Sequence, residues 1–419
     1  MPAHNIFFFG LIALLAGLLA GTTIGFTGAI IGAGAALILF CIWLQQSDSV
    51  NPLFLASVFC LVFAVASFYA PYRVAMRETR ASAAISSVPA FSFLSHLKDY
   101  TLSVFDRTLR GDQGALMSGL LIGERKKFSP TMIDAMRISG TTHIVALSGY
   151  NIMIVSSFAL SFFGFFLTRR FAFLTATAAI ILFVIMTGAA PSLVRAAILG
   201  IVVLLAFQTE RPYHPRNAIA LTAALMAIHD PRILGFDIGF QLSFAALLGI
   251  VYVRPLLGPL IQEKSARSAR LPDGQGSASG GKLLRWIRDQ FLTTLAAQLA
   301  VLPLLLFHFG QFSLFSVFAN LLILWTLPLL MLLGFVIIIT AAALPFFAHL
   351  IAGFTSLLLA YVVGVISWFG SLSFSSFTVR GFEFPASILY SLLLALFLAS
   401  LYKKKARHEI VFQEDEGLA

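Results

Sequence analysis

Apolar runs long enough to cross a lipid bilayer recur along most of this 419-residue chain. A helix needs roughly 17 to 25 predominantly apolar residues to span about 30 Å of hydrocarbon. Because 59% of the residues are hydrophobic and only 11% are charged, a soluble fold would leave too much apolar surface in water. The sequence therefore predicts an all-α polytopic membrane protein, with roughly 11–13 transmembrane or re-entrant helices and an amphipathic interfacial helix.

The expected spans differ in length, and one of them contains a proline near its middle. Pro328 predicts that the run over residues 313–343 is a broken or re-entrant element. Glycines spaced four residues apart, among them Gly17 and Gly21, predict close helix packing near the amino terminus. The spans are expected near residues 6–23, 27–44, 53–70, 143–167, 171–188, 192–207, 216–229, 237–253, 291–308, 313–343, 346–369 and 385–402.

Lysine and arginine in short loops predict the orientation, because such loops stay cytoplasmic. The net charge of +10 fits basic loops facing anionic lipid. The organisation that follows has five parts. They are amino-terminal transmembrane helices over 1–70, an extracytoplasmic connection with an amphipathic helix over 71–110, a membrane core over 111–402, a cytoplasmic linker near 262–282 that interrupts this core, and a charged cytoplasmic tail over 403–419.

Polar side chains inside these spans are expensive and usually face a bundle interior or a wet path. Arg195 lies four residues beyond Pro191, which is expected to begin a helix. Arg195 is either a snorkelling interfacial residue or a cation lining an anion pathway. Asp237 and Gln241 share a helix face, where Asp237 is expected to cap the helix. Gln241 and Gln298 either join helices or face a shared interior.

The stretch RISGTTHIVALSGYNIMIV, residues 137–155, carries many polar residues at the entrance to an apolar run. Ser129 and Pro130 are expected to begin a helix that ends around Gly140. The Ser148–Gly149 pair predicts an unwound or re-entrant turn. A serine nucleophile assisted by His143 is a minor alternative, because the surrounding sequence is not GxSxG. The histidines show no metal-ligand spacing, and both cysteines, Cys41 and Cys60, are expected to pack as small apolar residues.

Four blocks in order resemble the membrane core, or competence domain, of the ComEC-type DNA-internalisation family. They are GLLIGERKKFSPTMIDAMRISGTTHIVALSGYNI, PSLVRAAI, PRNAIALTAALMAIHDPRILGFDIGFQLSFAALLGI and LAAQLAVLPLLLFHFGQFSLFSVFANLL, and they cover roughly residues 111–343. The resemblance implies a polytopic channel in the bacterial inner membrane that passes single-stranded DNA into the cytoplasm during natural transformation. It implies a polar path formed by Arg137, His143, Ser148, Arg195, Asp237, Gln241, Gln298 and Asn320. Asn151, which stands where fuller members of the family have histidine, is a further candidate position of the path. The arginines would attract phosphates.

The resemblance also suggests which functions this sequence does not carry. No HxHxDH cluster and no GxxxxGK[ST] loop occurs in it, so we expect no enzymatic activity, no cofactor and no resident metal. A separate DNA receptor, a separate nuclease and a cytoplasmic ATPase are the expected partners, besides single-stranded DNA and membrane lipid. The alternatives are a transporter or channel for a small anionic solute, and a membrane scaffold whose polar residues only pack.

Overall fold

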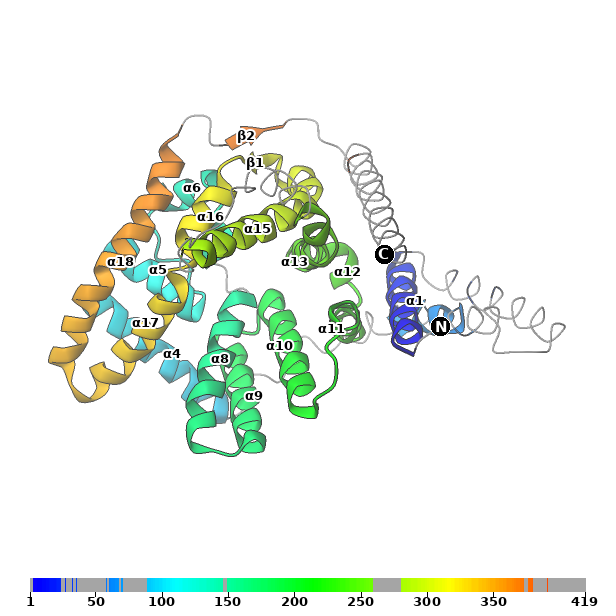
Figure 1. Cartoon of the computed structure of the whole chain (residues 1–419), viewed down its shortest axis with the longest axis horizontal. Helices are drawn as coiled ribbons and strands as arrows, with labels where there is room; N and C mark the ends of the chain where they lie inside the picture. The colour runs from blue at the N-terminus through cyan, green and yellow to red at the C-terminus, as the bar shows by residue number, and fades with distance from the viewer. Residues whose placement is uncertain are drawn as a thin grey trace, which may run out of the picture. The chain divides into compact units, whose positions relative to one another are not determined.

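The computed structural model describes residues 3–23, 60–67, 69–70, 89–145, 149–258, 280–372 and 376–379, with the single residues 27, 32, 35, 58 and 390. These ranges are almost entirely helical (Figure 1). Seven of the described helices are long and apolar enough to cross a membrane, and a bent helix pair makes an eighth candidate. The predicted all-α polytopic membrane fold is confirmed. The spans predicted near 27–44 and 385–402, the linker up to residue 279 and the tail over 403–419 lie almost wholly outside the described residues.

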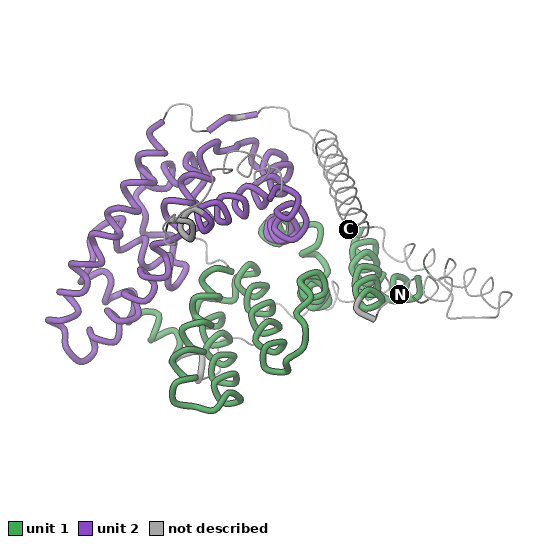
Figure 2. Tube along the Cα trace, in the orientation of Figure 1, with its two compact units in different colours: residues 1–99, 148–241 green, residues 100–147, 242–419 purple. Residues whose placement is uncertain are grey.

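The chain divides into two compact units, and each unit combines segments that are distant in sequence (Figure 2). Unit 1 comprises Met1–Asp99 and Ser148–Gln241. Unit 2 comprises Tyr100–Leu147 and Leu242–Ala419. Two of the three boundaries between the units fall within helices, one in α4 (Pro89–Thr108) after Asp99 and one in α13 (Ile238–Leu248) after Gln241.

Unit 1 is built around three consecutive helices, α8, α9 and α10, each of which contacts the other two. A tight turn joins α9 to α10, in which Gly188 and Ala189 both have a positive φ. Pro191 begins α10, as the sequence predicts. The elements of unit 1 are α1 (Ala3–Thr23), α8 (Gly149–Phe166), α9 (Arg169–Met186), α10 (Pro191–Thr209), α11 (Pro215–His229) and α12 (Ile233–Phe236).

Glycines of α1 allow another helical segment of unit 1 to approach its backbone. A β-carbon at Gly17 would overlap the Phe63 carbonyl oxygen, and one at Gly21 would overlap the Ser67 carbonyl oxygen. The Ser67 hydroxyl donates to the Gly17 carbonyl at 2.9 Å. The close packing predicted from the glycine spacing is therefore confirmed at these two positions, and α1 also contacts α11.

Unit 2 is organised around its longest apolar helices. The helix α18 contacts α5, α6, α16 and α17. Two three-residue strands pair antiparallel, with Phe312 opposite Phe377. The sequence did not predict these strands, because three residues are too few to show a period of two. The elements are α5 (Gly111–Ile122), α6 (Pro130–Ile138), α7 (Thr142–Val145), η1 (Gly249–Val253), α15 (Gly280–Phe309), β1 (Gln311–Ser313), α16 (Ser316–Leu324), α17 (Leu327–Ala343), α18 (Pro345–Ser371) and β2 (Ser376–Thr378).

The first turn of α6 is fixed by side-chain hydrogen bonds. The Ser129 hydroxyl accepts from the Met132 backbone N–H at 3.2 Å, so Ser129 caps the helix. The Asp112 carboxylate on α5 accepts from the Ser129 N–H at 2.9 Å and from its hydroxyl at 2.8 Å. The helix ends at Ile138, two residues before Gly140. The predicted start and end of this helix are both confirmed.

Two helical irregularities shape unit 2. The helices α16 and α17 meet at an angle of 48°, and Pro328 lies in the first turn of α17. The broken element predicted from Pro328 is confirmed. The π-turn η1 follows α13, and Gly249 lies so close to α15 that a β-carbon would be 2.6 Å from the Ala296 carbonyl oxygen.

The predicted amphipathic helix after residue 88 forms α4, which ends at Thr108. Val104 and Phe105 are buried, whereas Phe93 and Leu97 are exposed. Phe93, Leu97 and Val104 share one face of the helix, so this apolar face is exposed near the start of α4 and buried near its end.

Candidate functional site

Unit 2 contains a buried polar cluster, which we define as Ser139, Thr141, Ser313, Ser316 and Asn320. Every member exposes less than a tenth of its surface. Ser139 and Thr141 lie in the turn between α6 and α7, and their hydroxyl oxygens are 2.8 Å apart. The other three members come from β1 and α16. The fold thus joins two polar segments that lie far apart in the chain.

Gly140 is the point at which these two segments touch. A β-carbon at Gly140 would lie 2.6 Å from the Ser316 Cβ and 2.9 Å from the Ser313 Cβ. Gly140 also has a φ of +71°, in the left-handed region that glycine favours. Asn320 follows Ser316 by one helical turn, so both side chains lie on one face of α16. The turn therefore docks on the same end of α16 that carries the cluster.

Two oxygens of the cluster have unmet hydrogen-bonding capacity. The Ser313 hydroxyl and the Asn320 carbonyl oxygen are buried and have no hydrogen-bond partner among the residues that the structure describes. Buried polar atoms in native proteins are nearly always hydrogen-bonded, to protein, water or ligand. The cluster can therefore accept hydrogen bonds from a bound water or from a polar ligand.

Three further predicted residues of unit 2 differ in their relation to this cluster. His143 lies in α7, directly after the docked turn, and its Nδ1 lies 3.0 Å from the Gly140 carbonyl oxygen. The side chains of His143 and Arg137 are exposed. Gln298 is half-buried on α15, on the side opposite Ala296 and therefore away from η1. Through Gly140 the structure connects His143 to the turn that contacts Ser316 and Ser313, and it does not bring Arg137 or Gln298 into the cluster.

Arg195 is buried within unit 1 and exposes only 8% of its surface. Asn151 on α8 exposes 1%. Both lie beside the contact between α8 and α10, where a β-carbon at Gly200 would be 3.3 Å from Ile152. Burial of Arg195 among helices favours a position inside the bundle over the snorkelling alternative, in which the guanidinium would extend into water.

The position of Arg195 is costly for the fold. It lies in the second turn of α10, a helix whose sequence is largely apolar. Removing its charge from water costs several kcal/mol. An apolar side chain would be less expensive at this position, so the arginine points to a role other than stability.

Asp237 and Gln241 stabilise the corner between α12 and α13. The Asp237 carboxylate accepts from the Phe240 backbone N–H at 2.7 Å, which confirms the predicted cap. The Gln241 side-chain amide donates to the Gly235 carbonyl at 2.9 Å and to the Leu234 carbonyl at 3.3 Å. Both residues hold the local backbone, so a structural role is already assigned to each.

Substitution of Asp237 separates capping from charge. We expect Asp237→Ala to lower the stability of the protein by about 0.5–2 kcal/mol, because the cap is lost. Asp237→Asn retains a capping oxygen, and we expect its thermal unfolding midpoint to stay close to the wild-type value. Thermal unfolding of the purified protein in detergent measures both variants. Equal destabilisation by alanine and asparagine would contradict the capping role.

Ser148 lies outside the described residues, so the turn predicted at Ser148–Gly149 and the place of Ser148 in the polar path stay predictions. Within the described ranges, no group of three or more His, Cys, Asp or Glu side chains could hold a metal ion. The sequence did not predict four members of the cluster, Ser139, Thr141, Ser313 and Ser316. Their small hydroxyl side chains do occur in the SGTT and QFSLFS segments of the resembling blocks, which was the available signal.

Comparison with known proteins shows to which family the chain belongs. The model of the Competence protein family matches residues 120–404 of the chain. ComE operon protein 3 of Bacillus subtilis (strain 168) is 29% identical over 233 residues, which cover 54% of this chain and 26% of that protein. The chain thus aligns with about a quarter of the length of this curated relative. No solved structure matches it. Because the family model covers well over half of the sequence, the chain belongs to the Competence protein family.

Proposed function

We propose that this protein is a channel through which single-stranded DNA passes the bacterial inner membrane into the cytoplasm during natural transformation. Family membership supports a role in DNA uptake. The helices that are long enough to cross a bilayer support a multi-pass membrane protein. The proposed channel has no nuclease activity of its own and works with a separate DNA receptor, a nuclease and a cytoplasmic ATPase.

The observation that carries the proposal is the buried arginine of a membrane-crossing helix. Arg195 places a cation within α10, a helix of 19 residues with an apolar sequence. A DNA strand carries one phosphate per nucleotide, and phosphates bind cations with release of counterions.

The buried polar cluster supplies the second kind of contact that a strand requires. The Ser313 hydroxyl can donate to a phosphate or sugar oxygen, and the Asn320 carbonyl oxygen can accept from a base N–H, without adding charge. Uncharged contacts of this kind allow a strand to move on, because they bind each phosphate less tightly than an ion pair does. Arg137, His143, Ser148, Asn151, Asp237, Gln241, Gln298 and Asn320 remain proposed as the further polar positions of the path.

Deletion of the gene in the native host tests this proposal. We expect labelled DNA to remain outside the cytoplasm of the deletion strain, whereas DNA bound at the cell surface is unchanged. Expression of the full chain from a plasmid should restore entry. The measurement is the amount of nuclease-protected, labelled single strand in the cytoplasmic fraction.

The same strains distinguish the small-anion alternative. If deletion leaves DNA entry unchanged in a competent culture and abolishes uptake of a small anionic solute, the DNA channel is refuted and the solute transporter is supported. If neither flux changes, both proposals fail and the scaffold alternative stands.

A further inference from the structure

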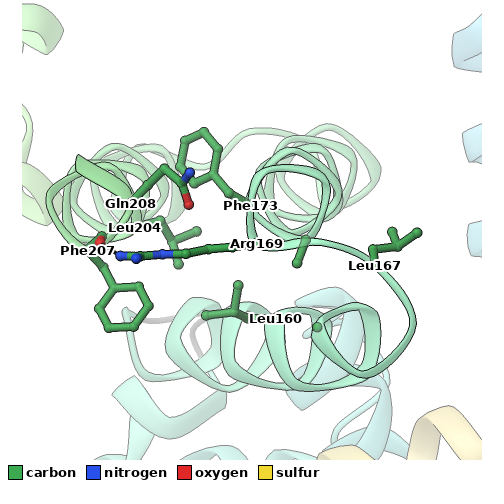
Figure 3. Close-up of a pocket in the computed structure, with 9 residues that line it drawn as sticks. Leu160, Leu167, Arg169, Phe173, Leu204, Phe207 and Gln208 are labelled. Carbon is green, nitrogen blue, oxygen red and sulfur yellow. Dashed lines mark hydrogen bonds between the residues drawn. The ribbon is translucent and has the colours of Figure 1, made fainter. Parts of the chain in front are cut away.

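A small cavity opens at one end of the three-helix bundle in unit 1 (Figure 3). Its volume is about 250 Å³. This is roughly eight times the 30 Å³ that one water molecule occupies in the liquid, and below the range of drug-sized pockets. Its lining comes from the end of α8, the start of α9 and the end of α10, and includes Leu160, Gly164, Phe173, Leu204 and Phe207.

One cationic side chain crosses this apolar cavity. Arg169 extends from the start of α9 toward Phe207 at the end of α10 (Figure 3). Its guanidinium donates to the Glu210 carboxylate at 2.8 Å and to the Phe207 carbonyl, and its Cζ lies 5.1 Å from the Phe207 ring centre. A guanidinium has five N–H donors, so these bonds leave donors for an additional anion.

The surroundings of the cavity are those of a membrane interface. Phe162, Phe165, Phe166 and Phe171 are all exposed on the helices that flank the α8–α9 turn. Arg170 is exposed beside Arg169 in the same turn. Exposed phenylalanines next to arginines match the boundary between acyl chains and anionic headgroups, where basic side chains attract phosphate.

We propose that this cavity binds the acyl chain of an anionic phospholipid, whose headgroup phosphate contacts Arg169 and Arg170. The apolar walls match a hydrocarbon chain, and the volume suits a segment of one chain. The donors at the mouth match a phosphate. The proposed lipid site lies wholly within unit 1 and does not depend on the proposed DNA channel.

A glycine in the cavity wall provides the test. A β-carbon at Gly164 would meet no heavy atom within 4 Å, so Gly164→Leu extends into the cavity without displacing the backbone. Leucine also favours a helix more than glycine does. We expect this variant to bind phosphatidylglycerol about tenfold more weakly than the wild type, because leucine excludes at least two methylene groups of the chain. Native mass spectrometry of the purified full chain with added phosphatidylglycerol measures the binding.

Gly353→Leu on α18 is the matched control. Gly353 is also helical, also has no heavy atom within 4 Å of a β-carbon, and does not line the cavity. We expect it to bind phosphatidylglycerol as the wild type does. The variant Arg170→Gln should reduce the preference for phosphatidylglycerol over phosphatidylcholine with matched chains, because one cation at the mouth is removed.

Three further results would overturn the lipid site. The first is equal binding of phosphatidylglycerol by Gly164→Leu and Gly353→Leu. The second is equal binding of phosphatidylglycerol and phosphatidylcholine by the wild type. The third is that inorganic phosphate alone raises the thermal unfolding midpoint as much as phosphatidylglycerol does, which would assign the site to a free anion.

Discussion

Replacement of Arg195 by methionine is expected to reduce DNA entry into the cytoplasm by about tenfold to a hundredfold. A hydrogen bond to a charged group contributes about 1.5–3 kcal/mol, and this contribution is lost with the guanidinium. The stability of the variant should equal or exceed that of the wild type, because an apolar side chain of similar length replaces a buried charge. Entry of labelled DNA at matched membrane levels and the thermal unfolding midpoint are the two measurements.

Two variants control for charge and position. Arg195→Lys keeps a cation and should retain part of the DNA entry, since lysine binds phosphate as a point charge. Arg211→Met removes an exposed arginine from the loop after α10 and should leave entry unchanged. If Arg195→Met instead lowers the unfolding midpoint and the amount of protein in the membrane, Arg195 is a structural residue. The burial of Arg195 would then no longer support the DNA channel.

Binding of single strands by the purified protein gives an independent measure of the same contact. The logarithm of the affinity should fall linearly with the logarithm of the salt concentration. The slope for Arg195→Met should be less steep by about one than the wild-type slope, as expected for the loss of one phosphate contact. An unchanged slope would exclude a direct contact between Arg195 and the DNA backbone.

Gly140→Ala is expected to lower stability by about 2–5 kcal/mol. The left-handed φ costs about 1–2 kcal/mol for a residue with a β-carbon, and overlap with Ser316 and Ser313 adds about 1–3 kcal/mol. The docked turn would move away from α16, and the buried polar cluster would separate. We expect a clear decrease in the thermal unfolding midpoint in detergent and a loss of DNA entry.

Gly111 supplies a matched control for the backbone contribution. Gly111 also has a positive φ, of +53°, but a β-carbon there would meet no heavy atom within 4 Å. Gly111→Ala should therefore show only the smaller, conformational cost. The double variant Gly140→Ala, Ser316→Gly should recover part of the lost stability, because the closest overlap is removed. Equal effects of alanine at Gly140 and Gly111 would show that the close contact of Gly140 with Ser313 and Ser316 does not contribute to stability.

The features that the sequence predicted correctly are governed by local chemistry. Ser129 followed by Pro130 indicated a helix start, and Gly140 indicated its end, because caps depend on a few adjacent residues. Pro328 indicated a break because proline cannot donate in a helix. The cap at Asp237 followed from its place before an apolar run. Each of these is confirmed in the structure.

The features that the sequence did not predict depend on contacts between distant residues. Nothing near Gly140 specifies that Ser313 and Ser316 pack against it, because that contact is made by tertiary folding. The cavity at Arg169 requires the ends of three helices to be known together. Burial separates Arg195 from Arg137, two arginines that the sequence alone had treated alike.

The π-turn η1 sets the direction in which the side chains that follow it point, relative to those of α13 before it. A π-turn contains one residue more than an α-helical turn, and one residue corresponds to about 100° of rotation. Side chains after η1 therefore point in directions that an uninterrupted α-helix would not give them. Arg254, whose guanidinium lies 3.6 Å from the Asp289 carboxylate on α15, depends on this extra residue. If η1 became a regular α-helical turn with all its residues retained, the rest of the helix would rotate by about 100° and Arg254 would turn away from Asp289, whereas deletion of one residue within 249–253 would leave this ion pair in place.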